Sequence, residues 1–258
     1  MLLAVLVVVL AYAWHDVHSR HARRTWDHTL SIAIVVLRAD ADASGARVDD
    51  ASIDALRGRA PALEARLTEE IHRYRPSAPK PFELTIFGPI DGVPPPPAAT
   101  GDGIVALASH EWDLRSWTRD VDQRANLAAG AFDSRVYVTV HAPRGKRHMV
   151  EGASEQGGRV GTVTIDLDAK VVDFALAVIA HELFHTLGAL DHYDDAGNAK
   201  FPEGYAQPDL VPRVPQRFVE IMTRGRPVAP GKEETLDTLD DLAVGPATAR
   251  EIGWSQEE

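Results

Sequence analysis

Cysteine is absent from this chain of 258 residues. Disulfide bonds are therefore excluded, and so is any metal site that depends on thiolate ligands. A metal bound by this chain would have to be held by histidines and carboxylates. The compartment stays open, because a bacterial protein outside the cytoplasm does not need disulfides.

Positive charge is scarce relative to negative charge. The chain has 27 Lys and Arg residues against 38 Asp and Glu residues, a net charge of -11. A nucleic-acid partner is not expected, because such a partner requires a basic surface. An acidic surface instead favours basic or neutral peptides.

A long apolar run is found at the N-terminus, over Met1–Trp14. As a helix it would span roughly 21 Å, which is less than the ~30 Å hydrocarbon core of a membrane. We favour a membrane anchor; a signal peptide cleaved after Ala13 and a buried element of the fold are the alternatives. Arg20, Arg23 and Arg24 follow the run, although positive charge tends to stay on the cytoplasmic side. We assign residues 1–26 to this anchor or signal segment and its juxtamembrane stretch.

The most informative stretch begins at His181 and reads His-Glu-Leu-Phe-His-Thr-Leu-Gly-Ala-Leu-Asp. His181 and His185 are four residues apart, so on a helix both rings project from one face and can bind one tetrahedral Zn²⁺. Glu182 lies beside that metal, where it can accept a proton from water. Gly188 allows a left-handed turn out of the helix. Asp191 is then placed to approach as a third ligand.

Chance is a poor explanation of this spacing. For this composition, His-Glu-x-x-His followed by the glycine has a random expectation of roughly 0.002. A buried helix with two hydrogen-bonded histidines and a purely structural zinc site are the plainer alternatives. The third ligand is also open: His192 is a neighbouring zinc donor, and a distant glutamate, Glu203 or Glu220, is a further possibility.

The motif resembles that of the metzincin zinc peptidases, in which a methionine turn lies beneath the metal. Met222, in the stretch Glu220–Gly225, is the candidate for that turn. The resemblance implies a zinc metalloendopeptidase with His181, His185 and Asp191 as ligands, in which a zinc-activated water hydrolyses peptide bonds with Glu182 as general base. It also implies an extracytoplasmic catalytic domain, membrane-anchored or secreted, with a peptide or protein as substrate.

Some family features are less clear in this chain. A tyrosine often follows the methionine in the family, whereas Thr223 and Arg224 follow here, so Tyr193 and Tyr205 are substitute candidates. The family's antiparallel edge strand, which pairs with the substrate, would fall between Met149 and Val160, where a surface loop is the alternative. A non-catalytic zinc-binding or protein-interaction domain, and a membrane-bound scaffold without metal, remain competing functions.

The order of elements predicts an α+β fold. The resemblance implies that this fold is metzincin-like, with a twisted mixed sheet packed on helices and a small irregular C-terminal subdomain. The catalytic domain is assigned to residues 27–258, divided near 188 into an upper and a lower part. Proline is expected to break or kink the first helix at position 61, and Asp168 to cap the active-site helix. Trp112 and Trp117 are expected in the core on a broad apolar stripe. Strands are expected over Thr29–Arg38, Pro81–Gly88, Ser134–His141 and Val160–Leu167, and helices over Asp50–Arg75, Gly103–Leu127, Val171–Leu187 and Pro246–Ile252.

Overall fold

The computed structural model describes residues 22–42, 45–98, 101, 103–143, 150–154 and 156–255. Met1–Trp14 and the signal cleavage site proposed after Ala13 lie outside the described residues. The centre of the molecule is a five-stranded sheet in the order β2-β1-β3-β5-β4, parallel except for the antiparallel edge strand β4. Its strands are β1 (Leu30–Arg38), β2 (Phe82–Asp91), β3 (Ser134–His141), β4 (Val150–Ser154) and β5 (Val160–Asp166).

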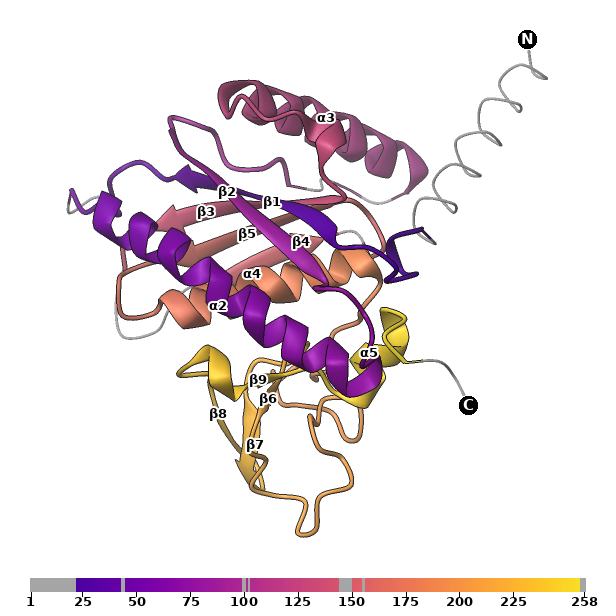
Figure 1. Cartoon of the computed structure of the whole chain (residues 1–258). Helices are drawn as coiled ribbons and strands as arrows, with labels where there is room; N and C mark the ends of the chain where they lie inside the picture. Colours follow the sequence, from indigo (N-terminus) through magenta and orange to yellow (C-terminus); the bar gives the residue numbers. More distant parts are fainter. Residues whose placement is uncertain are drawn as a thin grey trace.

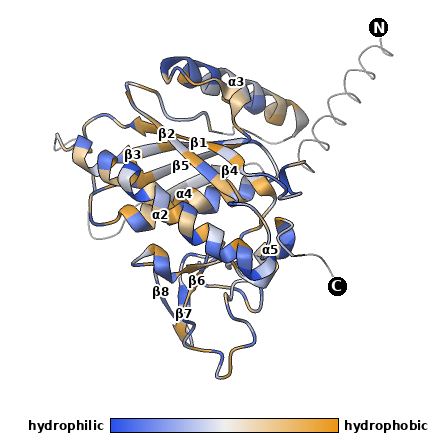
Figure 2. Cartoon of the chain, in the orientation of Figure 1, coloured by the Kyte–Doolittle hydropathy of each residue, from blue (hydrophilic) through white to orange (hydrophobic). Residues whose placement is uncertain are grey.

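Helices cover both faces of this sheet (Figure 1). The helices α2 (Asp50–Tyr74) and α4 (Val172–Leu187) share one face, and α3 (Ile104–Arg124) covers the other. Figure 2 shows polar and apolar colours along both α2 and α3, as expected of helices that lie between a core and solvent. The result is a mixed α/β arrangement with a largely parallel sheet flanked by helices, which agrees with the predicted α+β class at this coarse level.

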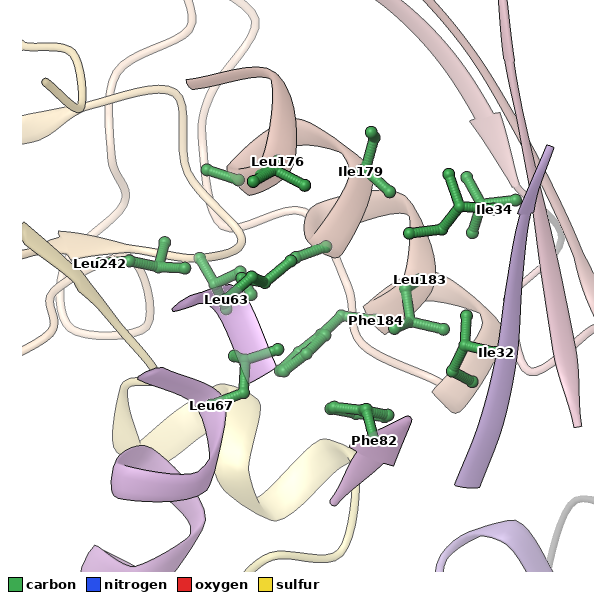
Figure 3. Packing of buried hydrophobic residues seen from close by; sticks show 14 of the residues in the cluster. Ile32, Ile34, Leu63, Leu67, Phe82, Leu176, Ile179, Leu183, Phe184 and Leu242 are labelled. Carbon is green, nitrogen blue, oxygen red and sulfur yellow. The ribbon is translucent and has the colours of Figure 1, made fainter. Parts of the chain in front are cut away.

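Strand β1 lies in the middle of the sheet and is apolar on both sides. Its even-numbered residues from Leu30 to Val36 join the core formed with α2 and α4, and its odd-numbered residues from Ala33 to Leu37 face α3. A strand buried on both faces reads as a continuous apolar run, which is why the sequence identified it. Figure 3 shows Ile32 and Ile34 beside Leu183 and other side chains of α4, with Leu63 of α2 farther along the same cluster.

Helix α2 does not break at Pro61, contrary to the sequence prediction. The helix runs through 25 residues with the proline inside it. Residues on both sides of the proline, such as Leu56 and Leu67, are fully buried in the same core. Packing of both halves onto one surface therefore outweighs the local cost of the proline.

Helix α3 differs from its predicted apolar stripe. Trp112 is 76% exposed, and Val105 and Leu107 are exposed as well. Val121 is buried and Trp117 packs edge-on against Tyr137 at a ring-centroid distance of 5.2 Å. Among the described residues, α3 contributes Trp117 and Val121 to the core beneath it, and both lie in its C-terminal half. Trp112 is not a core residue.

The start of α4 also differs from the prediction. The residue that precedes the helix is Val171, and no side chain caps its first turn. Asp168 instead accepts a hydrogen bond from the backbone nitrogen of Lys170 within the preceding turn, at 2.7 Å. Asp168 lies three residues before the cap residue Val171, so its carboxylate stabilises the preceding turn and does not cap the helix.

The C-terminal part, from about residue 189, lies below the sheet and is mostly irregular (Figure 1). The predicted helix after Gly245 is present, one residue shorter, with proline in its first turn. Its regular elements are β6 (Val219–Glu220) paired with β9 (Leu242–Ala243), β7 (Arg226–Ala229) paired with β8 (Lys232–Glu234), and α5 (Pro246–Glu251).

Two described residues before position 27, Arg23 and Trp26, belong to the folded domain. Trp26 is buried, with its ring 5.6 Å from that of Phe82 and 5.7 Å from that of Trp254. Arg23, assigned from sequence to a juxtamembrane stretch, is buried and donates hydrogen bonds to the hydroxyl of Ser134 and the carbonyl of Thr186. The domain therefore begins no later than Arg23, because these contacts tie it to the core.

The predicted transmembrane helix is not borne out. Within the residues that the structure describes, no helix combines the length and the apolar character needed to cross a membrane. This finding contradicts the membrane assignment. The run Met1–Trp14, on which that assignment depended, is outside the described chain.

Candidate metal centre

Helix α4 brings the two histidines of the motif together. It is apolar around most of its circumference and is packed against the sheet, so the two rings project from a rigid support. The Nε2 atoms of His181 and His185 lie 3.1 Å apart, and the two rings meet edge to face. Four-residue spacing on one helical face accounts for this pairing.

Each ring is oriented by a backbone carbonyl on its other side. Nδ1 of His181 lies 2.9 Å from the carbonyl oxygen of Ile221, and Nδ1 of His185 lies 2.9 Å from that of Ala189. A carbonyl oxygen can only accept a hydrogen bond, so each Nδ1 carries the proton and donates it. Both Nε2 atoms are then left with lone pairs directed at the same point, as in metal-binding histidines.

Asp191 completes a triangle of donor atoms. The helix ends at Gly188, whose φ of 108° is left-handed, and the chain turns back toward the two rings. Oδ1 of Asp191 lies 3.2 Å from Nε2 of His181 and 3.3 Å from Nε2 of His185. When both Nε2 atoms are unprotonated, three acceptor atoms from separate side chains therefore converge on one point.

This triangle fits a zinc ion. A tetrahedral Zn²⁺ with bonds of ~2.0–2.1 Å requires donor atoms roughly 3.3–3.4 Å apart, close to the three separations found here. Burial raises the pKa of Asp191, but hydrogen bonds from His181 and His185 outweigh this and hold the pKa well below its usual range. The carboxylate is consequently ionised, which is the form that binds a cation.

Without a cation, the same contacts also act on His185. Burial lowers the pKa of His185, whereas hydrogen bonds to Asp191 and to the carbonyl of Ala189 raise it, and the net shift is upward. The cluster therefore attracts positive charge, which either a proton or a metal ion supplies.

Glu182 lies beside the triangle and beneath the edge strand. Its side chain, with those of His181 and His185, offers ligand atoms that all lie within 4.8 Å of one another. Oε2 of Glu182 accepts a 2.6 Å hydrogen bond from the hydroxyl of Ser154 on β4. Since Asp191 already closes the triangle, Glu182 is free to act as a base instead of a ligand.

His192 is placed elsewhere. It is buried, with Nε2 3.0 Å from Oε1 of Glu251 and Nδ1 3.8 Å from Oε2 of Glu220. Burial lowers the pKa of His192, but hydrogen bonds and charge from these two glutamates raise it to about 9. A protonated histidine between two carboxylates is a structural ion pair, so the alternative third ligand does not face the other two histidines.

The two glutamates considered as distant ligands are also not at the centre. Glu220 is buried, and its carboxylate accepts hydrogen bonds from the backbone nitrogens of Met222 and Gly245 and from the hydroxyl of Thr248. Glu203 is exposed, and within the described chain no contact joins it to the histidine pair.

The turn that contains Met222 supports the centre from below. Met222 is fully buried in the main core. The carbonyl of Ile221 orients His181, and the carbonyl of Met222 accepts a hydrogen bond from the backbone nitrogen of His192 at 3.0 Å. The turn is held in place by Glu220, as described above, so one buried carboxylate fixes the backbone that orients a candidate ligand.

Tyr193 and Tyr205 differ in position. The Tyr193 ring lies nearly parallel to that of His181, at a centroid distance of 6.5 Å. Burial raises the pKa of Tyr193, and the charge of Asp191 adds to the increase, while Arg224 opposes it. Tyr205 packs against Phe201 in the lower part. Of the two tyrosines suggested by the sequence, Tyr193 is the one beside the candidate metal centre.

A cleft of about 760 Å³ opens over the centre. Gly152 and Ser154 of β4 form part of its wall, together with Glu182 and the three candidate ligands. Sequence reasoning missed these two β4 residues, although the two-residue period of a strand puts both on the same face. An apolar part of the wall consists of Phe174, Ala177, Val178, Val219, Leu236 and Leu242.

No protein-family model and no curated protein matches this chain. Among solved structures, the chain is similar to one described as "Structure of a chaperone-substrate complex", with 14% sequence identity and a TM-score of 0.36. The similarity covers 90% of this chain and 40% of that chain, so this chain spans less than half the length of the matched structure. Such a weak likeness supports no inference about function.

Proposed function

We propose that the protein is a zinc-dependent endopeptidase of the metzincin type. The observation that carries the proposal is the position of Asp191, whose Oδ1 lies 3.2 and 3.3 Å from the Nε2 atoms of His181 and His185. Three protein ligands with one position left open are typical of catalytic zinc sites, whereas structural sites usually have four.

The fold is compatible with this proposal. The antiparallel edge strand β4 precedes the active-site helix, a glycine ends that helix, and a buried methionine turn lies below the histidines. These features occur in the order that the metzincin resemblance implies. Since no family model matches the chain, the proposal depends on these features in combination.

His181, His185 and Asp191 would hold the metal. Zinc bound there would supply Lewis-acid polarisation of a peptide carbonyl and lower the pKa of water. Glu182 takes a proton from the attacking water as the water oxygen bonds to the carbonyl carbon. It then delivers that proton to the amide nitrogen as the carbon–nitrogen bond breaks, so that one amine and one carboxylic acid are formed.

Strand β4 gives the substrate a surface to pair with. It is at the edge of the sheet and its inner face carries Gly152 and Ser154 over Glu182. An extended peptide that adds to this edge would lie along the cleft, because strand addition fixes the backbone by main-chain hydrogen bonds. The apolar part of the cleft wall would then receive an apolar side chain of the peptide.

The decisive test compares wild type with Glu182→Gln. Wild type should contain one zinc per chain and cleave casein or a peptide library in a chelator-sensitive reaction, and the variant should keep zinc and lose cleavage by ~100-fold or more. Glu203→Gln, an exposed position outside the cleft, is the matched control and should cleave normally. Zinc binding without cleavage by wild type would favour the non-catalytic zinc-binding alternative.

A further inference from the structure

Arg224 has a position in the cleft that the proposed chemistry does not use. Its side chain is exposed and contributes to the wall of the cleft over the metal centre. The guanidinium carbon lies 4.5 Å from the centroid of the Tyr193 ring, and that ring in turn stacks on His181. One aromatic ring, that of Tyr193, thus separates this cation from the candidate metal ligand His181.

Arg224 is the one lysine or arginine among the described residues that line this cleft. The carboxylates of the wall are those of Glu182 and Asp191, and both are engaged, by Ser154 and by the two histidines respectively. In the described part of the chain Arg224 forms no ion pair with a carboxylate. Other arginines, such as Arg59 with Asp173, are paired. Among the described residues, no carboxylate takes up the charge of Arg224, and we take that charge as available to a ligand in the cleft.

The side chain is held from two sides. The backbone at its base is fixed because the hydroxyl of Thr223 donates to the carbonyls of Glu220 and Gly225. A β-carbon at Gly197, whose φ is +86°, would lie 3.2 Å from Cδ of Arg224, so the loop at Gly197 packs closely against the stem. A pre-positioned guanidinium loses less conformational entropy when it binds a ligand.

We propose that Arg224 binds a carboxylate of the substrate peptide, either an acidic side chain near the scissile bond or the C-terminal carboxylate. A guanidinium presents paired N–H donors that match the two oxygens of a carboxylate. This inference rests on the proposed peptidase function and adds a substrate class to it. It reverses locally the preference for basic or neutral peptides that the net charge of -11 suggests, because a direct contact outweighs screened, distant charge.

Binding of uncleaved peptides gives a test that does not require activity. Zinc-loaded Glu182→Gln would be titrated with peptides that carry Asp or Asn at each position in turn, and with free or amidated C-termini. One Asp peptide, or the free C-terminus, should bind about 10-fold more tightly than its neutral counterpart. The Asp scan and the C-terminal pair distinguish the two sources of the carboxylate.

The second variant adds Arg224→Gln to Glu182→Gln and should bind acidic and neutral peptides equally, with affinity for the neutral peptide unchanged. The matched control adds Arg213→Gln, which removes an exposed arginine that also stacks on an aromatic ring, Phe201, but does not line the cleft. This control should keep the 10-fold preference.

Two results would overturn the inference. One is equal binding of acidic and neutral peptides by the Glu182→Gln variant in which Arg224 is intact. The other is an equal loss of affinity for every peptide when Arg224→Gln is added, which would assign Arg224 to the peptide backbone or to the fold. If the Glu182→Gln variant prefers peptides with the carboxylate but wild type cleaves no peptide, the peptidase function is refuted while the carboxylate site remains supported.

Discussion

A β-carbon on Gly152 would lie 1.7 Å from Oε1 of Glu182. The edge strand and the candidate base are therefore in direct contact, and a larger residue at position 152 would displace the Glu182 carboxylate. This contact joins the proposed substrate surface to the proposed proton acceptor, and the first test below depends on it.

Gly152→Ala should displace the Glu182 carboxylate while zinc remains bound. A catalytic group moved by about 1 Å costs roughly 100-fold in rate, so we expect a loss of that order in kcat/KM, measured beside zinc content. Gly58→Ala is the control, since a β-carbon there meets nothing within 4 Å. It should leave activity unchanged and raise stability by about 1 kcal/mol, because alanine favours helix α2. Full activity of Gly152→Ala would contradict the observed contact.

Asp191→Ala should weaken zinc binding, whereas His192→Ala should leave it unchanged. Removing Asp191 takes away a donor, so the zinc-dependent increase in Tm should shrink or vanish. Removing His192 should leave zinc stoichiometry intact and destabilise the fold by roughly 3 kcal/mol, because Glu220 and Glu251 lose their buried partner. Metal analysis and urea unfolding measure both quantities. Loss of zinc from the His192 variant alone would reverse the assignment.

Arg23→Met should destabilise the domain. The guanidinium donates hydrogen bonds to Ser134 and to the carbonyls of Gly157, Gly158 and Thr186, and these acceptors would lose a buried donor. We expect a loss of about 3 kcal/mol in the free energy of unfolding. The neighbouring Arg24 is exposed, so Arg24→Met should change stability by less than about 0.5 kcal/mol. Equal stability of the two variants would place the start of the domain after residue 23.

Asp173 gives a stability term that depends on pH. A hydrogen bond from Arg59 lowers the pKa of Asp173 below its usual value. A carboxylate with a lowered folded pKa stabilises the protein above its unfolded pKa near ~4 and loses that contribution as pH falls through the folded value. Asp173→Asn should thus be less stable than wild type by about 1 kcal/mol at pH 7.

The stabilities of wild type and Asp173→Asn should become equal in acid. Between pH 4 and pH 2 the difference in unfolding free energy between wild type and Asp173→Asn should fall toward zero, as the wild-type carboxylate takes up its proton. Urea unfolding across this range measures it, and Arg59→Gln should show the same pH profile. A difference that persists at low pH would mean that packing, not charge, accounts for the effect.

Local rules were enough for several parts of the molecule. The two-face burial of β1 follows from an apolar run, and the pairing of His181 with His185 follows from helical spacing. Gly188 ends the helix as expected, because only glycine adopts its left-handed angle without strain. In each case the sequence pattern that predicts the feature lies within a few residues along the chain.

Other features depended on segments far apart in sequence. Helix α2 continues through Pro61 because both of its halves pack on one core. Trp112 is exposed, whereas Trp117 and Val121 in the C-terminal half of α3 join the core. The buried network of Arg23 joins residues more than 100 positions apart. No local pattern carries that information.

The sequence by itself determined that the imidazoles of His181 and His185 occur on one helical face, since the helical repeat fixes their relation. Only the tertiary structure decided between Asp191 and His192, which are adjacent in the chain. Glu220 and Glu251 hold the His192 side chain in the lower core, while the backbone directs Asp191 to the two rings. Neighbouring side chains point in different directions, and which one meets the two histidines is set by partners that the fold brings from about 30 and 60 residues away.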